Sequence, residues 1–421
     1  MCGCLGVTTV IFIILLFTVI IPAIIQDFVD STNLQIQSTT IMSPNNVAFQ
    51  SVVVQSFSQA GPIPATAQLN DLTVSFDGPG GGNLITLSGT PAFTVSTSPV
   101  TLNALATVDN ITAFADFNRQ AINAKTIQWH LQGTVDVTAI VKTTVNLNKV
   151  VTLNGFDNFP IAPIVHSVNT TSGTPSMLTN VIHSTLNSVA DINIFFGQTL
   201  HFNITSEGIV IGAGLIADAK FLSGPFEILA NASLFADNDV SRVQLNKFLS
   251  NFSSGIPSTV NLVQFSTLDP VIEWLQPSLA SMSLPAAMPG LQSHLLIQIT
   301  LIIKGSDLKN GIQFKMELFN PEPAVSITMF SIAGKILINS TVIGTVNNTN
   351  VDIFIPPETT IETDPLPAAP ASSVAAEELT LQLIANGGGF LNVDTTINLV
   401  LGEFPASVTF KQSNVPTVIE T

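Results

Sequence analysis

Charged side chains are scarce in this chain of 421 residues. Only 10% of the residues are Asp, Glu, Lys or Arg, whereas about a quarter is usual for soluble proteins. Most of the charges are acidic, with 28 Asp and Glu against 12 Lys and Arg, so the formal net charge is −16. Proteins grip a phosphate backbone with clusters of Lys and Arg. The deficit of basic residues therefore argues against nucleic acid as a partner.

Cysteine occurs only at Cys2 and Cys4, so the chain beyond them has neither a thiol nor a disulfide. That part must fold through burial and hydrogen bonding alone. Residue 2 is Cys rather than Gly, which excludes myristoylation. At a cytosolic membrane face Cys2 and Cys4 are candidates for S-acylation, and unmodified thiols are the alternative.

A charge-free run from Leu5 to Ile25, rich in Ile, Val, Leu and Phe, predicts a transmembrane helix. Its length at about 1.5 Å per residue matches the hydrocarbon core of a bilayer. No small-x-small cleavage site follows, which favours an uncleaved signal anchor over a cleaved signal peptide. Residues 1–4 then form a short cytosolic tail, and the rest of the chain is lumenal or extracellular.

Asn-x-Ser/Thr sequons fit a lumenal or extracellular location. A chain this rich in Asn, Ser and Thr is expected to contain about as many by chance, so the sequons are compatible with glycosylation without establishing it. The candidate glycosylation sites are Asn110, Asn169, Asn203, Asn231, Asn251, Asn339 and Asn347.

Alternation of apolar and polar residues with a period of two dominates the chain after the anchor, for example at 134–138 and 396–401. Glycine- and proline-rich turns separate these segments. The pattern predicts a mainly β fold, with tandem antiparallel β-sandwich or half-barrel units and a few short helices.

Three short helices are expected. Residues 239–252 carry an apolar stripe at helical spacing, with Ser241 as a plausible N-cap. A second stripe runs from Leu178 to Val189, and a third helix is expected from Asp269 to Trp274. In contrast, Glu377 and Glu378 follow a Pro/Ala-rich stretch and are expected in a solvated loop.

The chain contains a faint internal repeat. Residues 100–117 resemble residues 228–248, since in each an Asn-Ala strand leads through Asp-Asn into a helix that carries Phe. Asn103 and Asn231 occupy matching positions 128 residues apart. The repeat divides the chain into β-rich units at about 30–155, 156–288 and 289–421.

The third unit carries FKMELFNPEPAVSITMFSIAGKILINSTVIGTV at 314–346. This segment resembles the late-embryogenesis-abundant (LEA) type 2 domain, in which a strand ends in Asn-Pro, here Asn320 and Pro321. The middle of the chain, TIQWHLQGTVDVTAIVKTTVNLNKVVTLNGF at 126–156, is similar to a fungal family of unknown function with an N-terminal anchor and tandem domains of this kind. Some members of that family are vacuolar-membrane proteins linked to autophagy control.

This resemblance implies a small β-sandwich or half-barrel per unit, in which a sheet and a short helix can enclose an apolar groove. Lipid binding or transfer has been proposed for such grooves, and an apolar groove with few charges suits an acyl chain. An ordinary packed core is the alternative. The candidate groove or core residues are Phe117, Trp129, Phe248 and Trp274.

No pattern in the sequence supports catalysis, a cofactor or a metal. The histidines lack metal-ligand spacing, and neither a Cys nucleophile after the anchor nor a G-x-S-x-G turn is present. Asp237-Asn238-Asp239 resembles the start of a calcium loop but lacks the following Gly and the distant Glu, so an acidic helix cap explains it better.

The sequence therefore predicts a non-enzymatic single-pass membrane protein whose lumenal β units bind or transfer lipid at a vacuole-like membrane. The alternative is a structural or adhesion ectodomain at the plasma membrane that binds protein or glycan partners. A cavity inside the units would favour lipid, and solid cores with exposed apolar patches would favour protein partners.

Overall fold

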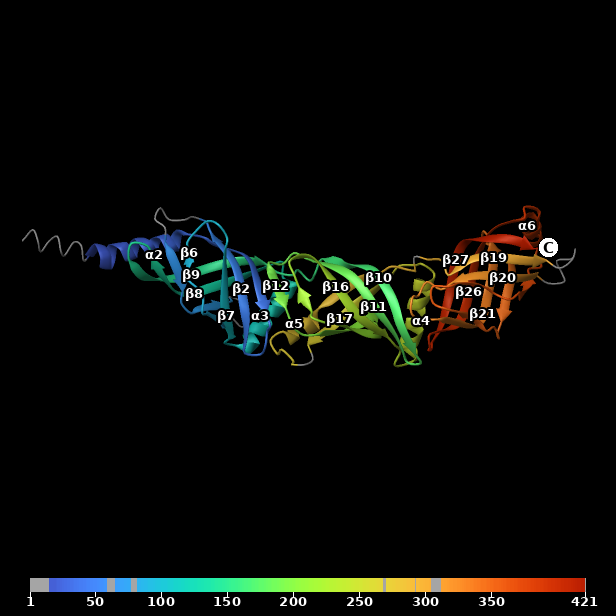
Figure 1. Cartoon of the computed structure of the whole chain (residues 1–421), viewed down its shortest axis with the longest axis horizontal. Helices are drawn as coiled ribbons and strands as arrows, with labels where there is room; N and C mark the ends of the chain where they lie inside the picture. The colour runs from blue at the N-terminus through green and yellow to red at the C-terminus, as the bar shows by residue number, and fades with distance from the viewer. Residues whose placement is uncertain are drawn as a thin grey trace, which may run out of the picture.

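The computed structural model describes residues 15–58, 65–76, 82–267, 270–291, 293–303 and 312–420. Figure 1 shows an elongated molecule in which β-rich units follow one another along the long axis in chain order. The predicted mainly β fold with few helices is confirmed.

The chain begins, in its described part, with helical residues at one end of the molecule (Figure 1). A π-helical turn, η1 (Leu16–Ile20), continues directly into α2 (Ile21–Ser31). Among the residues that the structure describes, no helix is long and apolar enough to cross a membrane. Residues 5–14 of the predicted anchor, together with Cys2 and Cys4, lie outside the described residues.

The first unit is a sheet with one helix against it. Its elements are β1 (Leu34–Met42), β2 (Ala48–Phe57), β3 (Thr66–Leu69), β4 (Leu72–Ser75), β5 (Asn83–Ser88), β6 (Phe93–Thr94), β7 (Val100–Val108), α3 (Ile111–Asn123), β8 (Thr126–Thr138) and β9 (Lys142–Asn154).

The second unit is a closed barrel, and two short strands from its stretch of chain, β12 (Ile192–Phe195) and β15 (Lys220–Phe221), join the sheet of the first unit. The barrel and its helices consist of β10 (Ile161–Thr174), β11 (Met177–Ser188), β13 (Leu200–Ser206), β14 (Ile209–Ile216), β16 (Gly224–Leu234), α4 (Asp239–Ser253), β17 (Ser258–Thr267), α5 (Gln276–Ser281) and β18 (Ser283–Met288).

The third unit is a nine-stranded sheet with one helix. It contains β19 (Leu296–Ile303), β20 (Ile312–Phe319), β21 (Ile327–Ile338), β22 (Thr341–Asn348), β23 (Ile353–Ile355), β24 (Thr360–Glu362), β25 (Leu366–Pro370), α6 (Val374–Ala385), β26 (Gly388–Leu401) and β27 (Phe404–Glu420).

The three units repeat one topology, which confirms the repeated β units. Hydrogen-bonded neighbours run β1-β2-β7-β5-β4-β8-β9 in the first, β10-β11-β16-β14-β13-β17-β18 in the second, and β19-β20-β25-β22-β21-β26-β27 in the third. A helix occupies the same place in each, between β7 and β8, between β16 and β17, and between β25 and β26. Asn103 and Asn231, the residues that revealed the repeat, lie on the equivalent strands β7 and β16.

The units differ in how the ring of strands is closed. In the second unit β10 pairs in parallel with β18, and in the third β19 pairs in parallel with β27. The equivalent strands of the first unit, β1 and β9, are not paired in the described structure. Instead, β12 pairs in parallel with the second half of β1, and Asn154 at the end of β9 accepts a 3.0 Å bond from the amide of Asp191, just before β12. We call the unpaired line between β1 and β9 the seam.

One predicted helix is confirmed and its cap is corrected. The helix α4 covers 239–253, but its N-cap is Asn238, whose side chain accepts a 3.0 Å bond from the Ser241 amide. Ser241 sits three positions into the helix, and its hydroxyl accepts a bond from the Asn238 amide. This reciprocal capping box satisfies two amides that the first helical turn leaves free.

Three other local predictions are wrong. The stripe at 178–189 belongs to strand β11, because pairing with both β10 and β16 outweighs its helical spacing. Residues up to Trp274 form a turn, and helix α5 begins only at Gln276; Asp269 lies outside the described residues. Glu377 and Glu378 lie in α6 rather than in a loop, because Ser373 caps that helix.

Specific contacts fix the first unit against the second. The Trp274 ring lies 4.7 Å from the Phe114 ring and 5.7 Å from the Phe49 ring, measured between centroids, and its indole N–H donates to the Asn45 carbonyl at 2.8 Å. The side-chain amide of Asn46 bonds to the backbone just before Trp274 from both ends, at 2.7 and 3.1 Å. These bonds and the pairing of β12 with β1 make the junction directional rather than a loose linker.

The second and third units meet through α4 and β27. Ser250 on α4 and Ser254, the residue that caps its C-terminus, bond to the backbone of Thr409 and Lys411 on β27, at 2.8 to 3.3 Å. Helix side chains therefore satisfy strand amides that no neighbouring strand pairs.

Asn320, one of the two motif residues, organises the third unit. It is fully buried, and its side-chain N–H₂ lies within 3.2 Å of the carbonyls of Val325, Ile355 and Pro356. Its carbonyl accepts a 3.0 Å bond from the amide of Glu322, and Pro321 follows it directly. One side chain thus joins three loop segments.

Replacing Asn320 by Ala should lower the free energy of unfolding of the third unit by about 3 kcal/mol, because several buried backbone groups lose their partner. Hydrogen exchange of the β21 and β26 amides measures this loss. Asn398→Ala is the matched control, since Asn398 is exposed and makes a 2.8 Å bond to Ser331; it should change stability by no more than about 0.5 kcal/mol. Equal effects of the two variants would contradict the structural role of Asn320.

Candidate functional site

The first unit encloses an apolar cavity of about 230 Å³. The cavities lined by the second and third units are smaller, about 100 Å³ and 30 Å³. The largest of these three spaces therefore lies in the unit whose first and last strands do not pair.

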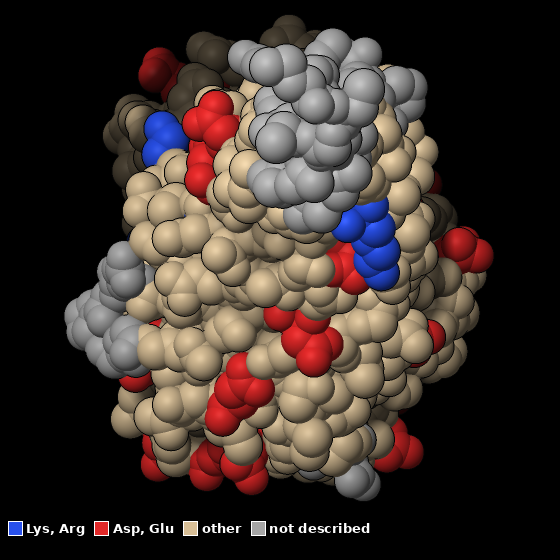
Figure 2. Space-filling model, turned by 90° about the vertical axis from the view of Figure 1, so that its left-hand side faces the viewer, with Lys and Arg blue, Asp and Glu red and all other residues tan. Residues whose placement is uncertain are grey.

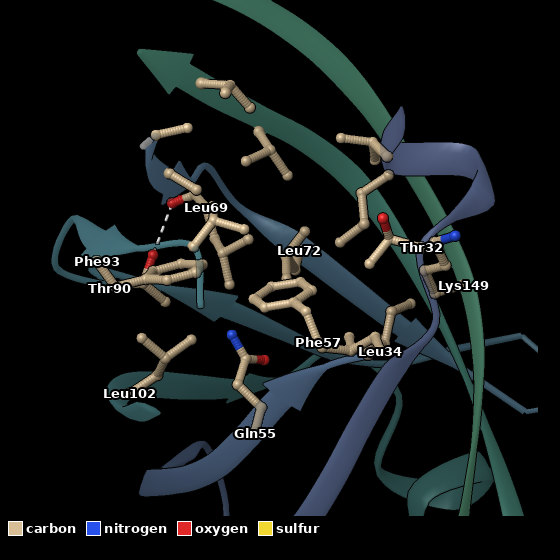
Figure 3. Close-up of a pocket in the computed structure, with 18 of the residues that line it drawn as sticks. Thr32, Leu34, Gln55, Phe57, Leu69, Leu72, Thr90, Phe93, Leu102 and Lys149 are labelled. Atoms are coloured by element: carbon tan, nitrogen blue, oxygen red, sulfur yellow. Dashed lines mark hydrogen bonds between the residues drawn. The ribbon is translucent and has the colours of Figure 1, made fainter. Parts of the chain in front are cut away.

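The cavity wall is made by residues that alternate inward along the strands. On β2 these are Val53, Gln55 and Phe57, and Figure 3 shows their neighbours from the facing strands closing around the same space. The lining from the strands and the segments beside them is almost entirely aliphatic or aromatic: Leu34, Ile36, Ala67, Leu69, Leu72, Leu87, Phe93, Leu102, Ala104, Trp129, Leu131, Val135, Val137 and Leu147.

Helix α2 lies against β9 and lines the cavity with Ile24, Ile25, Phe28 and Val29. Its sequence has apolar residues on successive turns, so one face is directed at the cavity. The cavity is open to solvent beside this helix, since Ile24 lines it and still keeps 62% of its surface exposed.

Polar bonds hold α2 along β9. The side-chain amide of Gln26 donates to the Asn146 carbonyl at 2.9 Å and accepts from the Asn146 amide at 2.8 Å, as a neighbouring strand would. Lys149 donates to the carbonyl of Asp30 at 2.8 Å, near the C-terminal end of α2 where a cation is favourable. Because β9 is one border of the seam, α2 partly takes the place that a pairing strand occupies in the other units.

Most polar groups that line the cavity are bonded within the protein. Thr90 donates to the Leu69 carbonyl at 2.7 Å, a bond drawn in Figure 3, and Thr32 donates to the Phe28 carbonyl at 2.7 Å. The exceptions among the described residues are the side-chain nitrogen of Gln55 and the indole nitrogen of Trp129, which are buried and unpartnered.

The cavity of the second unit is closed at one end by the third unit. Glu322 and Leu401 belong to the third unit and line that cavity together with Phe248. Glu322 accepts a 3.0 Å bond from the Thr170 amide on β10. Burial raises the pKa of the Glu322 carboxyl above its usual value, and hydrogen bonds from Thr170 partly offset that effect.

The structure separates the four residues that the sequence grouped as groove candidates. Trp129 lines the first cavity and Phe248 lines the second. Phe117 lies on α3, 5.3 Å from Phe76 between ring centroids, beside a space of only about 20 Å³. Trp274 is fully buried at the junction between the first two units, outside the first cavity.

Most of the candidate glycosylation sites are accessible. Asn110, Asn169, Asn231, Asn339 and Asn347 are exposed, although the Asn110 side chain also accepts a 3.0 Å bond as the N-cap of α3. In contrast, Asn203 and Asn251 are half-buried, and their side chains donate to Gln264 and Ser258.

No metal-ligand cluster of three or more His, Cys, Asp or Glu residues occurs in the described ranges. Asp237-Asn238-Asp239 leads into α4, and Asn238 is occupied with the capping box. His183 lies 3.5 Å from Glu227 on the neighbouring strand, and both side chains are substantially exposed.

Two features of the cavity were missed by sequence reasoning. Gln55 interrupts the inward-facing series of Val53 and Phe57, which is a signal that the sequence does contain. The packing of α2 over the seam has no local signature, because it depends on which strands fail to pair.

Comparisons with known proteins give one family match. Residues 84–202 match the model of an uncharacterised domain family, described as "Protein of unknown function (DUF3712)". The matched segment begins at β5 and ends within β13, so it spans the junction between the first two units. The LEA type 2 resemblance of the third unit stays a prediction. No curated protein matches the chain.

Similar solved structures include bacterial surface proteins. The Escherichia coli adhesin FdeC is 12% identical, with 90% of this chain and 96% of the adhesin covered and a TM-score of 0.18. The Enterococcus faecalis MSCRAMM ACE is 9% identical (61% and 95% covered, TM-score 0.14), and the N-terminal region of an enterococcal surface protein is 8% identical (62% and 94%, TM-score 0.14). At these scores the similarity carries no inference about fold or function.

Glu322→Gln should stabilise the chain at neutral pH and have little effect below the carboxyl's ordinary pKa of 4.5. A carboxyl whose pKa is raised on folding contributes stability at low pH that is lost as the pH rises through the folded pKa, and Gln removes that loss. Thermal unfolding of both proteins from pH 4 to pH 8 measures the difference. Glu403→Gln, at an exposed carboxylate in the same junction, is the control and should give parallel curves; a constant difference for Glu322→Gln would contradict the burial effect.

Proposed function

We propose that this chain is a non-enzymatic, membrane-anchored protein whose first unit binds a lipid in the cavity beneath α2. The observation that carries the proposal is an enclosed apolar space in the one unit whose ring is left open between its first and last strands. An ordinary packed core leaves no such void, since cores are packed about as densely as organic crystals.

The size and lining of the cavity suit one hydrocarbon chain. Its volume of about 230 Å³ is smaller than the usual small-molecule pocket of about 300 to 1,000 Å³, so it would hold a single chain at most. A charged headgroup would find little to pair with inside, because Lys149 at the border is the charged residue among the lining side chains. The lipid would therefore enter with its acyl part first.

The position of α2 supports delivery from a membrane. The predicted anchor at 5–25 ends within α2, and exposed apolar side chains lie on η1 (Phe17, Val19) and on α2 (Ile24). Figure 2 views this end of the molecule and shows a largely uncharged face with scattered carboxylates and few Lys or Arg. An apolar anchor, rather than attraction to anionic lipid headgroups, would hold such a face at a bilayer.

The predicted topology places the units in a lumen or outside the cell. The exposed sequons are compatible with that location, and the fungal resemblance favours a vacuole-like membrane, with the plasma membrane as the alternative. Cys2 and Cys4 would then lie on the cytosolic side, where S-acylation is common.

A structural or adhesion role is the second candidate. The bonds of Trp274 and Asn46 across the first junction, and of Ser250 and Ser254 across the second, would keep the ends of the molecule at a fixed separation. Such rigidity would suit a spacer that presents its far end to a protein or glycan partner.

Ala104→Leu should reduce co-purified lipid about tenfold, because the added side chain occupies the cavity and displacing it costs about 1–3 kcal/mol. The measurement is lipid extraction and mass spectrometry of the full chain purified from a secretory host. Ala232→Leu is the matched control: Ala232 occupies the equivalent position on β16 and lines the second cavity. It should leave the lipid unchanged.

If Ala232→Leu loses its lipid and Ala104→Leu does not, the lipid binds in the second unit and not in the first. A lipid-free wild-type chain of normal stability would contradict lipid binding and leave the structural role as the leading function.

A further inference from the structure

Gln55 is an unusual residue for the wall of an apolar cavity. It lies on the inward face of β2 between Val53 and Phe57 and is only 4% exposed. Figure 3 shows its amide pointing from β2 into the cavity, on the side where Phe57, Thr90 and Leu102 also lie. An apolar side chain at this position would complete the hydrophobic wall.

The side-chain nitrogen of Gln55 has no hydrogen-bond partner among the residues that the structure describes. Leaving a buried donor unsatisfied costs about 1–3 kcal/mol, so such groups are rare in folded proteins. Trp129, across the same cavity lining, also has a buried and unpartnered indole N–H. The Trp129 ring borders both this cavity and the small space beside Phe117, so Gln55 is the unused donor of a cavity whose Thr32, Thr90 and Lys149 side chains are bonded.

The second unit contains a polar cavity residue whose side chain is hydrogen-bonded within the protein, on the strand equivalent to β2 but at another position along it. Asn180 lies on β11, the strand equivalent to β2, and lines the second cavity. Its side-chain nitrogen donates to the Leu178 carbonyl at 3.2 Å, and its oxygen accepts from the Thr170 hydroxyl at 3.1 Å. Groups of the protein therefore bond both ends of the Asn180 amide, whereas the side-chain nitrogen of Gln55 has no partner among the described residues.

We propose that Gln55 recognises a hydrogen-bond acceptor within the bound lipid. The ligand is then a neutral lipid with a carbonyl or ester oxygen close to its acyl chain, rather than a plain hydrocarbon. Donors select an acceptor strongly, because a ligand that lacks the oxygen leaves them unpaired. This inference rests on the proposed lipid site and adds the chemistry that the site selects.

A comparison of two probes of equal heavy-atom number tests the selection. Binding of 2-undecanone and of n-dodecane to the full chain is followed by gas chromatography of the headspace, which reports the free probe. The wild-type chain should prefer the ketone. Gln55→Met keeps the side-chain length but removes the donor, so the preference should fall about tenfold while n-dodecane binds as before.

Gln50→Met is the matched control, because Gln50 lies on the exposed face of the same strand. It should retain the wild-type preference. An unchanged preference in Gln55→Met would overturn the role of Gln55 while leaving the lipid site intact. If the wild-type chain, freed of lipid, binds neither probe, the proposed function itself fails.

The stability of the ligand-free chain gives a second readout. Gln55→Met removes an unsatisfied buried donor, so its Tm should equal or exceed that of the wild type. A Tm lower by several degrees would show that Gln55 already has a structural partner, and would contradict a donor held ready for a ligand.

Discussion

Pairing between the first and last strands is the constraint on which the architecture depends. Every unit has the same strand order, so each must either join its two border strands or cover them. The second and third units join them through β10 with β18 and β19 with β27. In the described structure of the first unit β1 and β9 lie near each other but do not pair, and their seam is covered by β12 from the following unit and by α2. The unit whose border strands do not pair also has the largest of the three cavities compared above.

The cover of the seam connects two otherwise separate features of the chain. The predicted anchor ends within helix α2, and the apolar face of this helix lines the cavity. Gln26 and Lys149 hold it to β9 with three hydrogen bonds, which are exposed to solvent and so individually weak. Side-chain bonds and apolar packing thus hold α2 over the seam, whereas a ladder of backbone bonds closes a paired barrel.

Sequence reasoning reached the features that are local or repeated. Alternation predicted the strands, the matching positions of Asn103 and Asn231 revealed the repeat, and an apolar stripe located α4. It failed where strand pairing determines the secondary structure. The segment at 178–189 has helical spacing but belongs to a central strand between β10 and β16. The seam could not be predicted, because a missing pair leaves no mark on either strand. Gln55 was visible as a break in the inward series, but its meaning required the cavity.

The most direct test of the account is hydrogen exchange along the border strands of the full chain. The amides of β9 should exchange faster than those of β27, its equivalent in the third unit, because β27 is paired on both sides over part of its length. Addition of 2-undecanone should slow exchange in β9 and α2 and leave β27 unchanged. Equal protection of β9 and β27, with no response to the ketone, would contradict an open seam that leads to a lipid site.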